Sequence, residues 1–213
     1  MNILYSDDSE EIRQYLSTSE GLSNINCEDD DGITPLYYAC ENNRTDVVDV
    51  LIEFGADLNF DCHYVGRALH AACEKGNIDV VYQLLNAGAD PNLDNYQGAT
   101  PIMWAVEHLH LDIVKFLTIY SDFDHTDRNG DNIFSYAIYS NNKEIIDYVF
   151  DFCKDINHIN VNDWSYLHGA VYGKNTYAIS LLLAKGIDVD IQDHYGKKAI
   201  DHTKDPEILR MLF

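Results

Sequence analysis

The sequence has few basic side chains. Only 14 of its 213 residues are Lys or Arg, against 36 that are Asp or Glu, so the formal net charge is −22. A phosphate backbone or an anionic membrane surface would repel a chain of this charge, and we expect neither to be a direct partner. Two interpretations of the acidity stay open: it attracts a basic protein, or it serves only to keep the chain soluble.

Long apolar runs are also missing. The longest, residues 179–184, is interrupted by Ser180 and is far too short to span a bilayer. The first residues of the chain have neither the basic region nor the apolar run of a secretory signal. The five cysteines are an odd number without a Cys-x-x-Cys pair, which favours free thiols in a reducing compartment. We therefore expect a cytoplasmic protein.

Motifs for catalysis and for metal binding are absent as well. The sequence has no Gly-rich phosphate loop and no nucleophile elbow. His108 and His110 would need a third ligand to hold a metal ion, and no His-x-x-x-His spacing accompanies them. The acidic run 127–131 resembles a calcium loop only faintly, because its Gly comes fourth rather than sixth and its twelfth residue is Ile138. We expect no enzymatic activity, no cofactor and no metal.

What the chain does contain is a helical repeat, seen most clearly in residues 68–92. A first helix built on small residues is followed by a Lys-Gly-Asn break and a second helix with an apolar stripe at helical spacing. Gly88 stands where the end of a helix takes a left-handed residue. Two helices this short cannot bury both apolar faces alone, so they need copies of themselves on either side.

The copies recur at a nearly constant interval. Equivalent apolar anchor residues are Leu36, Leu69, Ile102, Phe134, Leu167 and Ile200, at intervals of 33, 33, 32, 33 and 33 residues. An Ala stands three residues after the anchor in five of these six units. The ends of the units repeat too, as Gly-Ala-Asp in residues 55–57 and 88–90 and Gly-Ile-Asp in residues 186–188.

The period and its motif resemble those of the ankyrin-repeat family over nearly the whole chain. Residues 32–39 and 98–105 are the best matches to the family's Gly-x-Thr-Pro-Leu-His-x-Ala run. The resemblance implies an all-α solenoid of helix-turn-helix units joined by β-hairpin-like loops. It also implies that His70 and His168, beside their anchors, bond to loop backbone and take no part in catalysis.

On this pattern, residues 1–213 form a single domain. We expect truncated capping units at residues 1–28 and 193–213, with five central repeats at about 29–61, 62–94, 95–126, 127–159 and 160–192. Ser9 is expected to cap the first helix, and Asp205 followed by Pro206 to open the last one. Repeat four departs most from the pattern, because Asn-Ile-Phe replaces Thr-Pro-Leu and residues 150–154 contain no Gly.

The resemblance implies that hairpin tips and the exposed edge of the first helices form a concave recognition surface. Five residues after each anchor lies a position that the family leaves free to vary, and it is occupied by Glu41, Glu74, Glu107, Tyr139 and Tyr172. Neighbouring helices pack about 8–10 Å apart, close to the Debye length of about 8 Å, so the three carboxylates are predicted to act as one patch for a basic segment. Routine solvated glutamates are the open alternative.

The hairpin tips add further candidate binding residues, several of them aromatic. They are Asp30, Asp31, Ile33, Tyr64, Tyr96, Asp131, Trp164 and Tyr195. Rigid aromatic side chains dominate the hot spots of interfaces, so we expect the carboxylates to steer a partner and the aromatic rings to hold it.

The leading hypothesis is a non-catalytic protein–protein interaction module, monomeric when unbound. It would bind a basic protein or peptide through an acidic, aromatic-rich concave face. Two alternatives remain open. One is a stand-alone immunity or inhibitor protein that neutralises a basic toxin or nuclease, and the other is an adaptor or a host-directed effector.

Overall fold

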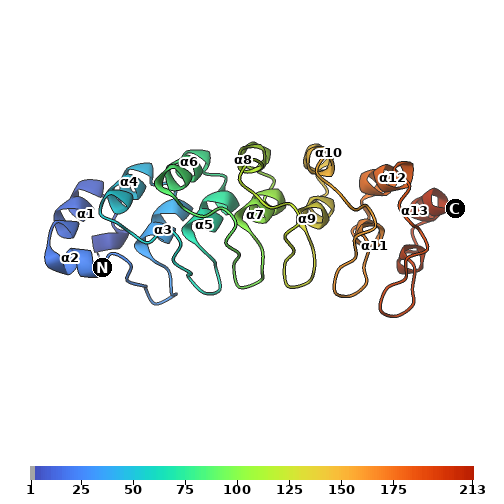
Figure 1. Ribbon diagram of the computed structural model, residues 1–213, viewed down its shortest axis with the longest axis horizontal. Helices are drawn as coiled ribbons and strands as arrows, with labels where there is room; N and C mark the ends of the chain where they lie inside the picture. Colours follow the sequence, from blue (N-terminus) through green and yellow to red (C-terminus); the bar gives the residue numbers. More distant parts are fainter. Residues whose placement is uncertain (1–2) are drawn as a thin grey trace. The chain divides into compact units, whose positions relative to one another are not determined.

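The computed structural model describes residues 3–213, so Met1 and Asn2, at the start of the expected N-terminal capping unit, lie outside the described residues. Every regular element among the described residues is a helix, as predicted (Figure 1). The α-helices are α1 Ser9–Leu16, α2 Ser19–Ser23, α3 Pro35–Glu41, α4 Thr45–Glu53, α5 Ala68–Lys75, α6 Ile78–Ala87, α7 Pro101–Glu107, α8 Leu111–Leu117, α9 Ile133–Ser140, α10 Lys143–Phe150, α11 Tyr166–Tyr172, α12 Thr176–Ala184 and α13 Pro206–Leu212. The 3-10 helices are η1 Ile3–Tyr5 and η2 Ala199–His202.

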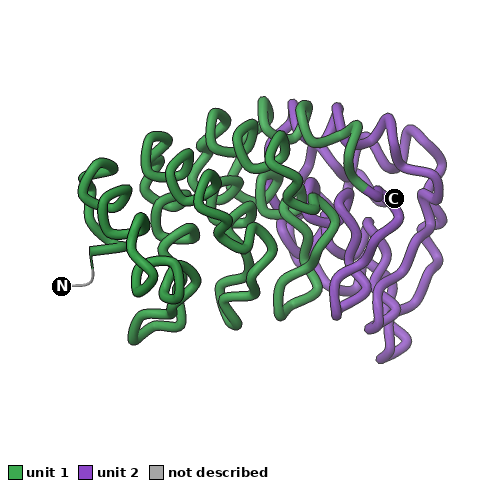
Figure 2. Tube along the Cα trace, turned by 60° about the vertical axis from the view of Figure 1, so that its left-hand side comes forward, with its two compact units in different colours: residues 1–121 green, residues 122–213 purple. Residues whose placement is uncertain are grey.

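The chain divides into two compact units, residues 1–121 and residues 122–213 (Figure 2). We call the first helix of each repeat its inner helix and the second its outer helix. In the first unit the inner helices α3, α5 and α7 pack side by side, and the outer helices α4, α6 and α8 form a second row. In the second unit α9 and α11 are inner helices, with η2 against α11, and α10 and α12 are outer helices.

The net negative charge is concentrated in the first unit. Residues 1–121 hold 21 acidic side chains against 5 basic ones, whereas residues 122–213 hold 15 against 9. Any long-range attraction for a basic partner therefore originates mainly in the first unit.

Helix starts follow from the capping residues in the sequence. Thr34 caps α3 because its hydroxyl accepts from the backbone N–H of Tyr37 at 3.3 Å. Asp205 caps α13, with Pro206 in the first turn, as predicted. The expectation for α1 was wrong by one residue: the carboxylate of Asp8, not Ser9, accepts from the N–H groups of Glu10 and Glu11. Asp8 has the extended backbone that an N-cap requires, while Ser9 is already helical.

Five of the six hairpin-like loops in the described residues are tied by an aspartate or asparagine side chain rather than by a sheet, and Cys62 takes this position in the loop of repeat two. Asp127 Oδ1 accepts from the N–H of Asn129 at 2.8 Å and of Asp131 at 2.9 Å, and Gly130 between them has a φ of +79°. The run that resembled a calcium loop is therefore a repeat turn. Only isolated β-bridges, such as Thr126 with Asn132, close the loops in the described part of the chain.

The predicted anchors form the core, with one exception. Leu36, Leu69, Ile102, Phe134 and Leu167 are buried, as are the small residues Cys40 and Cys73 at equivalent positions of α3 and α5. The sixth anchor, Ile200, is only half-buried, because no further repeat covers η2 among the described residues, and the preceding Ala199 is buried instead.

A comparison of Gly88 and Gly76 distinguishes the cost of backbone strain from the cost of a steric clash when a glycine is replaced. Gly88 ends α6 with φ +100° and has nothing within 4 Å of an added Cβ, whereas a Cβ on Gly76 (φ +77°) would lie 2.5 Å from the ring of His110. We expect Gly88→Ala to lower the free energy of unfolding by about 1 kcal/mol and Gly76→Ala by about 2–4 kcal/mol. Urea unfolding followed by circular dichroism measures both. Equal losses would show that the His110 contact contributes nothing.

Candidate functional site

The three predicted glutamates lie at the C-terminal ends of neighbouring inner helices. Glu41 is the last residue of α3, Glu74 the last but one of α5, and Glu107 the last of α7. Because α5 packs against both other helices, the three positions follow one another across the first unit. The C-terminal end of a helix carries negative partial charge, so a carboxylate there costs rather than adds stability. Helix stability therefore does not explain these glutamates.

A lysine that the sequence pattern did not single out lies within this row. Lys75 Nζ lies 2.8 Å from Glu74 Oε1 and 3.3 Å from Glu41 Oε1, so one ammonium bridges two carboxylates. The hydrogen bond to Glu74 is the main cause that raises the pKa of Lys75. Lys75 looked like part of the Lys-Gly-Asn break, and only the packing of α5 on α3 brings it to Glu41. The row is thus two bridged glutamates and the exposed Glu107.

The hairpin tips of the first unit present a tyrosine pair. Tyr64 is 79% exposed and Tyr96 is 41% exposed, and their rings meet edge to face with centroids 5.9 Å apart. Asp30 and Asp31 are exposed on the preceding tip. Ile33 is half-buried, and its carbonyl accepts from the hydroxyl of Tyr5 at 2.6 Å, so its backbone also supports the capping unit.

Trp164 belongs to an aromatic cluster in the second unit. The centroid of its ring lies 5.5 Å from that of the Tyr172 ring, 5.4 Å from that of the His202 ring and 6.0 Å from that of the His168 ring. Tyr172 is 70% exposed, while Trp164 is half-buried. The structure therefore brings together Trp164 and Tyr172, two of the predicted residues, with Tyr172 outermost and Trp164 supporting it.

Tyr139 and Asp131 form a second contact in this unit. The hydroxyl of Tyr139 donates to Asp131 Oδ1 at 3.2 Å, and Asn160 donates to the same oxygen at 3.2 Å. The Tyr139 ring lies against Gly169, where a Cβ would approach its Cε1 to 2.8 Å. Nearly half of the Tyr139 side chain is nonetheless exposed. Asp131 is committed to these two partners and is less available to a ligand than the sequence suggested.

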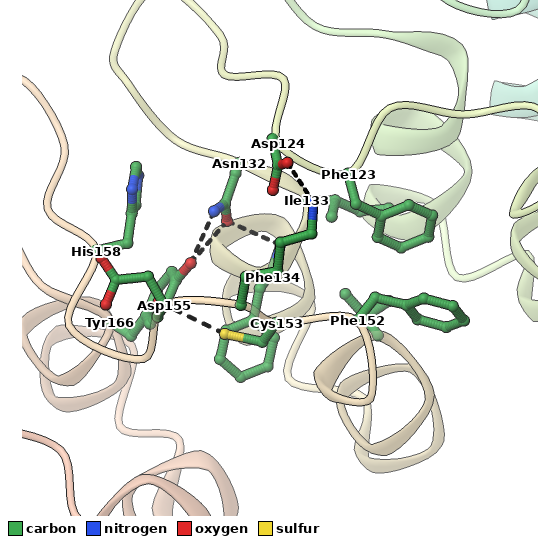
Figure 3. A pocket seen from close by; sticks show the side chains of 12 residues that line it. Phe123, Asp124, Asn132, Ile133, Phe134, Phe152, Cys153, Asp155, His158 and Tyr166 are labelled. Carbon is green, nitrogen blue, oxygen red and sulfur yellow. Dashed lines mark hydrogen bonds and ion pairs between the residues drawn. The ribbon is translucent and has the colours of Figure 1, made fainter.

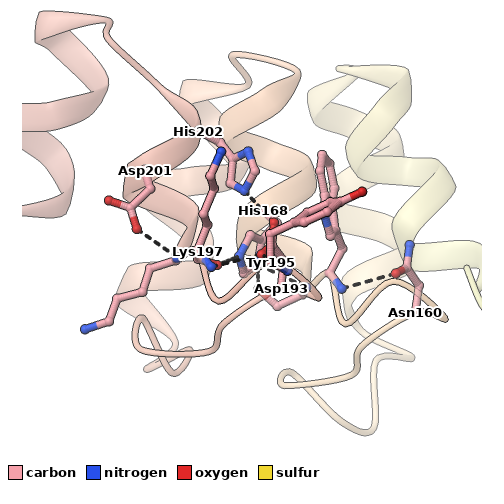
Figure 4. A network of polar contacts seen from close by, with 10 residues as sticks. Asn160, His168, Asp193, Tyr195, Lys197, Asp201 and His202 are labelled. Atoms are coloured by element: carbon pink, nitrogen blue, oxygen red, sulfur yellow. Dashed lines mark hydrogen bonds and ion pairs between the residues drawn. The ribbon is translucent and has the colours of Figure 1, made fainter.

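Tyr195 stands on a turn held by a polar network (Figure 4). Asp193 Oδ1 accepts from the N–H groups of Tyr195 and Lys197 at 2.9 Å each, and Asp193 Oδ2 lies 2.7 Å from His202 Nε2. The network fixes the backbone and leaves the Tyr195 side chain 81% exposed. The polar groups of the network bond to one another and to the backbone of the turn, so the side chain that the turn exposes is that of Tyr195.

Comparison with known proteins agrees with the periodicity and the fold. A family model described as "Ankyrin repeats (3 copies)" matches residues 1–95, 66–127 and 102–193. The chain belongs to the ankyrin-repeat family. Its structure resembles the ankyrin-repeat domain of Bcl-3, a member of the IkappaB protein family, with a TM-score of 0.80 and 19% identity over 98% of this chain and 95% of that one. It also resembles that of human ASB11, with a TM-score of 0.80 and 22% identity over 100% and 96% of the two chains.

One curated relative is a much longer protein. Alpha-latrotoxin-Lg1a of Latrodectus geometricus is 35% identical to this chain over 113 residues. The match covers 51% of this chain and only 8% of the toxin. In the described residues of this ankyrin-repeat chain, no three His, Cys, Asp or Glu side chains are grouped as metal ligands, and no helix is long and apolar enough to cross a membrane.

The two histidines beside the ankyrin anchors bond to backbone, as predicted. His70 Nε2 lies 3.0 Å from the carbonyl of Ala99, and His168 Nε2 lies 3.1 Å from that of Lys197. His70 Nδ1 accepts from the N–H of Arg67, which assigns the proton of the neutral ring to Nε2. Burial lowers the pKa of His70 to about 4.

This lowered pKa predicts a pH dependence of stability. Between about pH 6.5 and pH 4 the unfolded chain binds a proton at His70 that the folded chain does not, so stability falls as the pH falls through this window. We expect the free energy of unfolding to drop between pH 7.5 and 4.5 by about 2–3 kcal/mol more in the native chain than in His70→Gln. Urea unfolding at the two pH values tests this, and parallel losses in both proteins would contradict it.

Proposed function

We propose that this chain binds an extended basic segment of a protein, and that the inner-helix ends and hairpin tips of residues 1–121 supply the acidic part of the recognition surface. Ankyrin-repeat domains are protein–protein interaction modules, which supports binding in general. The observation that carries the finer proposal is the row Glu41, Glu74 and Glu107, because these carboxylates stand at the helix ends where negative charge is least favourable.

Two further observations support a basic partner. The first unit holds 21 acidic and 5 basic side chains, and this excess attracts a cationic segment before contact is made. The exposed pair Tyr64 and Tyr96 offers rigid rings on which aliphatic or guanidinium parts of such a segment can pack. In the second unit Tyr172, whose ring contacts Trp164, and the half-exposed Tyr139 offer the same chemistry.

A basic toxin or nuclease is one partner of the proposed kind, and the chain would then act as its inhibitor. Affinity purification of the chain from its own cells, followed by mass spectrometry, identifies the partner. The triple variant Glu41→Gln, Glu74→Gln and Glu107→Gln is the matched control, because it keeps the shape of the side chains and removes their charge. We also propose a cytoplasmic location, where buried thiols such as those of Cys40 and Cys73 stay reduced.

Charge variants test the steering role of the glutamates. With the purified partner, the triple Gln variant is expected to associate about tenfold more slowly at low salt and to lose most of its salt dependence, with little change in dissociation. Lys75→Gln is expected to act in the opposite direction, because it releases Glu41 and Glu74 from their shared ammonium. Stopped-flow or surface-plasmon kinetics at several salt concentrations measure both. The proposal fails if the two variants associate at the native rate.

Aromatic variants test the holding role of the exposed rings. Changing Tyr64, Tyr96, Tyr139 or Tyr172 to Ala one at a time is expected to speed dissociation, with at least one change costing about 2 kcal/mol of binding. Trp164→Ala is the contrasting variant, since this half-buried ring also supports the fold and its loss should lower the melting temperature. If all four Tyr variants dissociate at the native rate, the interface lies elsewhere.

A further inference from the structure

The second unit contains a cavity of about 160 Å³ at the C-terminal end of the outer helix α10 (Figure 3). Rings of Phe123, Phe134, Phe152 and Tyr166 line it, together with the polar residues Cys153, Asp124 and Asp155. Tyr139 and Tyr172, by contrast, lie at the C-terminal ends of the inner helices α9 and α11. The cavity is therefore separate from the surface proposed above.

The cavity exists because repeat four lacks an apolar side chain that fills the equivalent space, here called the plug, in three other repeats. In three regular repeats the residue after the loop glycine turns inward and is buried, as Ala56, Ala89 and Ile187. Its backbone N–H bonds to the carbonyl five residues earlier, for example Ala89 to Leu84 at 3.0 Å. Lys154 takes this position in repeat four, and its N–H makes no such bond among the described residues. Its side chain is 71% exposed instead of filling the space.

The preceding loop is irregular in the same place. From its anchor Ile102 to its loop aspartate Asp122, repeat three has one residue fewer than the other repeats, and it has no glycine before that aspartate. Phe123 of that loop stacks on Phe152 of the next, with centroids 4.6 Å apart and an angle of 29°. Two consecutive departures from the repeat pattern thus build one cavity with an aromatic wall.

The chemistry of the walls selects the occupant. A cavity of about 150 Å³ suffices to bind one benzene ring, so the space fits a single planar group. Asp124 and Asp155 contribute two carboxylates against the one ammonium of Lys154, and Lys154 Nζ already pairs with Asp124. Such exposed pairs are weak, so a cation from outside can replace the lysine. Planar guanidinium and amidinium groups both stack on aromatic faces and pair with carboxylates.

We propose that this cavity binds a planar cation about the size of one aromatic ring, of the amidinium or guanidinium class. The flat group would enter between Lys154 and the aromatic wall, with its charge toward Asp124 and Asp155. The thiol of Cys153 lies in the wall and donates to the carbonyl of Asp155 at 3.6 Å, so an occupant would cover it. The source is either a free small molecule or an arginine side chain of another protein.

Protection of Cys153 from alkylation tests the proposal. The full chain carries Cys27→Ser, which leaves Cys153 as the one thiol that is not buried, since Cys40, Cys62 and Cys73 are buried. Cys153 is labelled with iodoacetamide at about pH 8.5 in the presence of about 10 mM benzamidine, and mass spectrometry measures the rate of labelling. A dissociation constant near 1 mM slows labelling about tenfold. Neutral benzamide, nearly the same shape, should protect far less, and N-acetyl-argininamide tests whether an arginine side chain suffices.

Two variants at one position give the control. Lys154→Ile copies the plug of Ile187 and should abolish protection by benzamidine, whereas Lys154→Gln leaves the cavity open and should retain it. Asp124→Asn with Asp155→Asn should reduce protection by benzamidine toward that by benzamide, and this pair serves also if Lys154→Ile does not fold. Equal protection by benzamidine and benzamide, no protection by either, or full protection in Lys154→Ile would each overturn the proposal.

Discussion

Within each of the two units, the structure depends on hydrogen bonds that repeats make to the backbone of a neighbouring repeat. In three repeats the side chain of the residue before the outer helix bonds to the preceding inner helix: Asn77 to the carbonyl of Cys40 at 2.8 Å, His110 to that of Glu74 at 2.9 Å and Asn175 to that of Ile138 at 2.9 Å. His70 and His168 reach forward to the next hairpin. Because helix ends leave backbone groups unpaired, a repeat is satisfied only when its neighbours are in place.

Departures from the repeat pattern fall where this dependence is weakest. The loops after outer helices need a left-handed glycine and an inward-facing apolar residue, and repeats one, two and five supply both. Repeats three and four supply neither, so α8 and α10 end without that closure. Both helices stay intact because their apolar faces remain buried, as Val114 of α8 and Val149 of α10 show. An irregular loop therefore changes the local surface and leaves the packing of the helices in place.

Much of the fold could be predicted from the sequence, because a periodic pattern repeats the same evidence several times. The anchors and the closing helix after Asp205 followed from the residues themselves, and the resemblance to the ankyrin-repeat family implied the His–backbone bonds. The cap of α1 was misplaced by one residue because Asp8 and Ser9 have equal claims by residue type, and only backbone geometry separates them. Lys75 and the cavity at Lys154 escaped notice for a different reason. Each depends on a contact between residues about 30 positions apart in the chain, Lys75 with Glu41 and Lys154 with Asp124.

The core of this chain and the proposed recognition surface are made of different residues. Small apolar side chains such as Ala72 and Ala105 allow inner helices to approach closely, and they are fully buried. Two positions further along their inner helices, Glu74 is half-buried and Glu107 is exposed, so neither side chain belongs to this core. A solenoid stabilised by a distributed core and by bonds to neighbouring backbone tolerates unfavourable charge at such positions. Lys75 offsets part of this charge within the fold by pairing with Glu41 and Glu74, and Glu107 is the exposed member of the row.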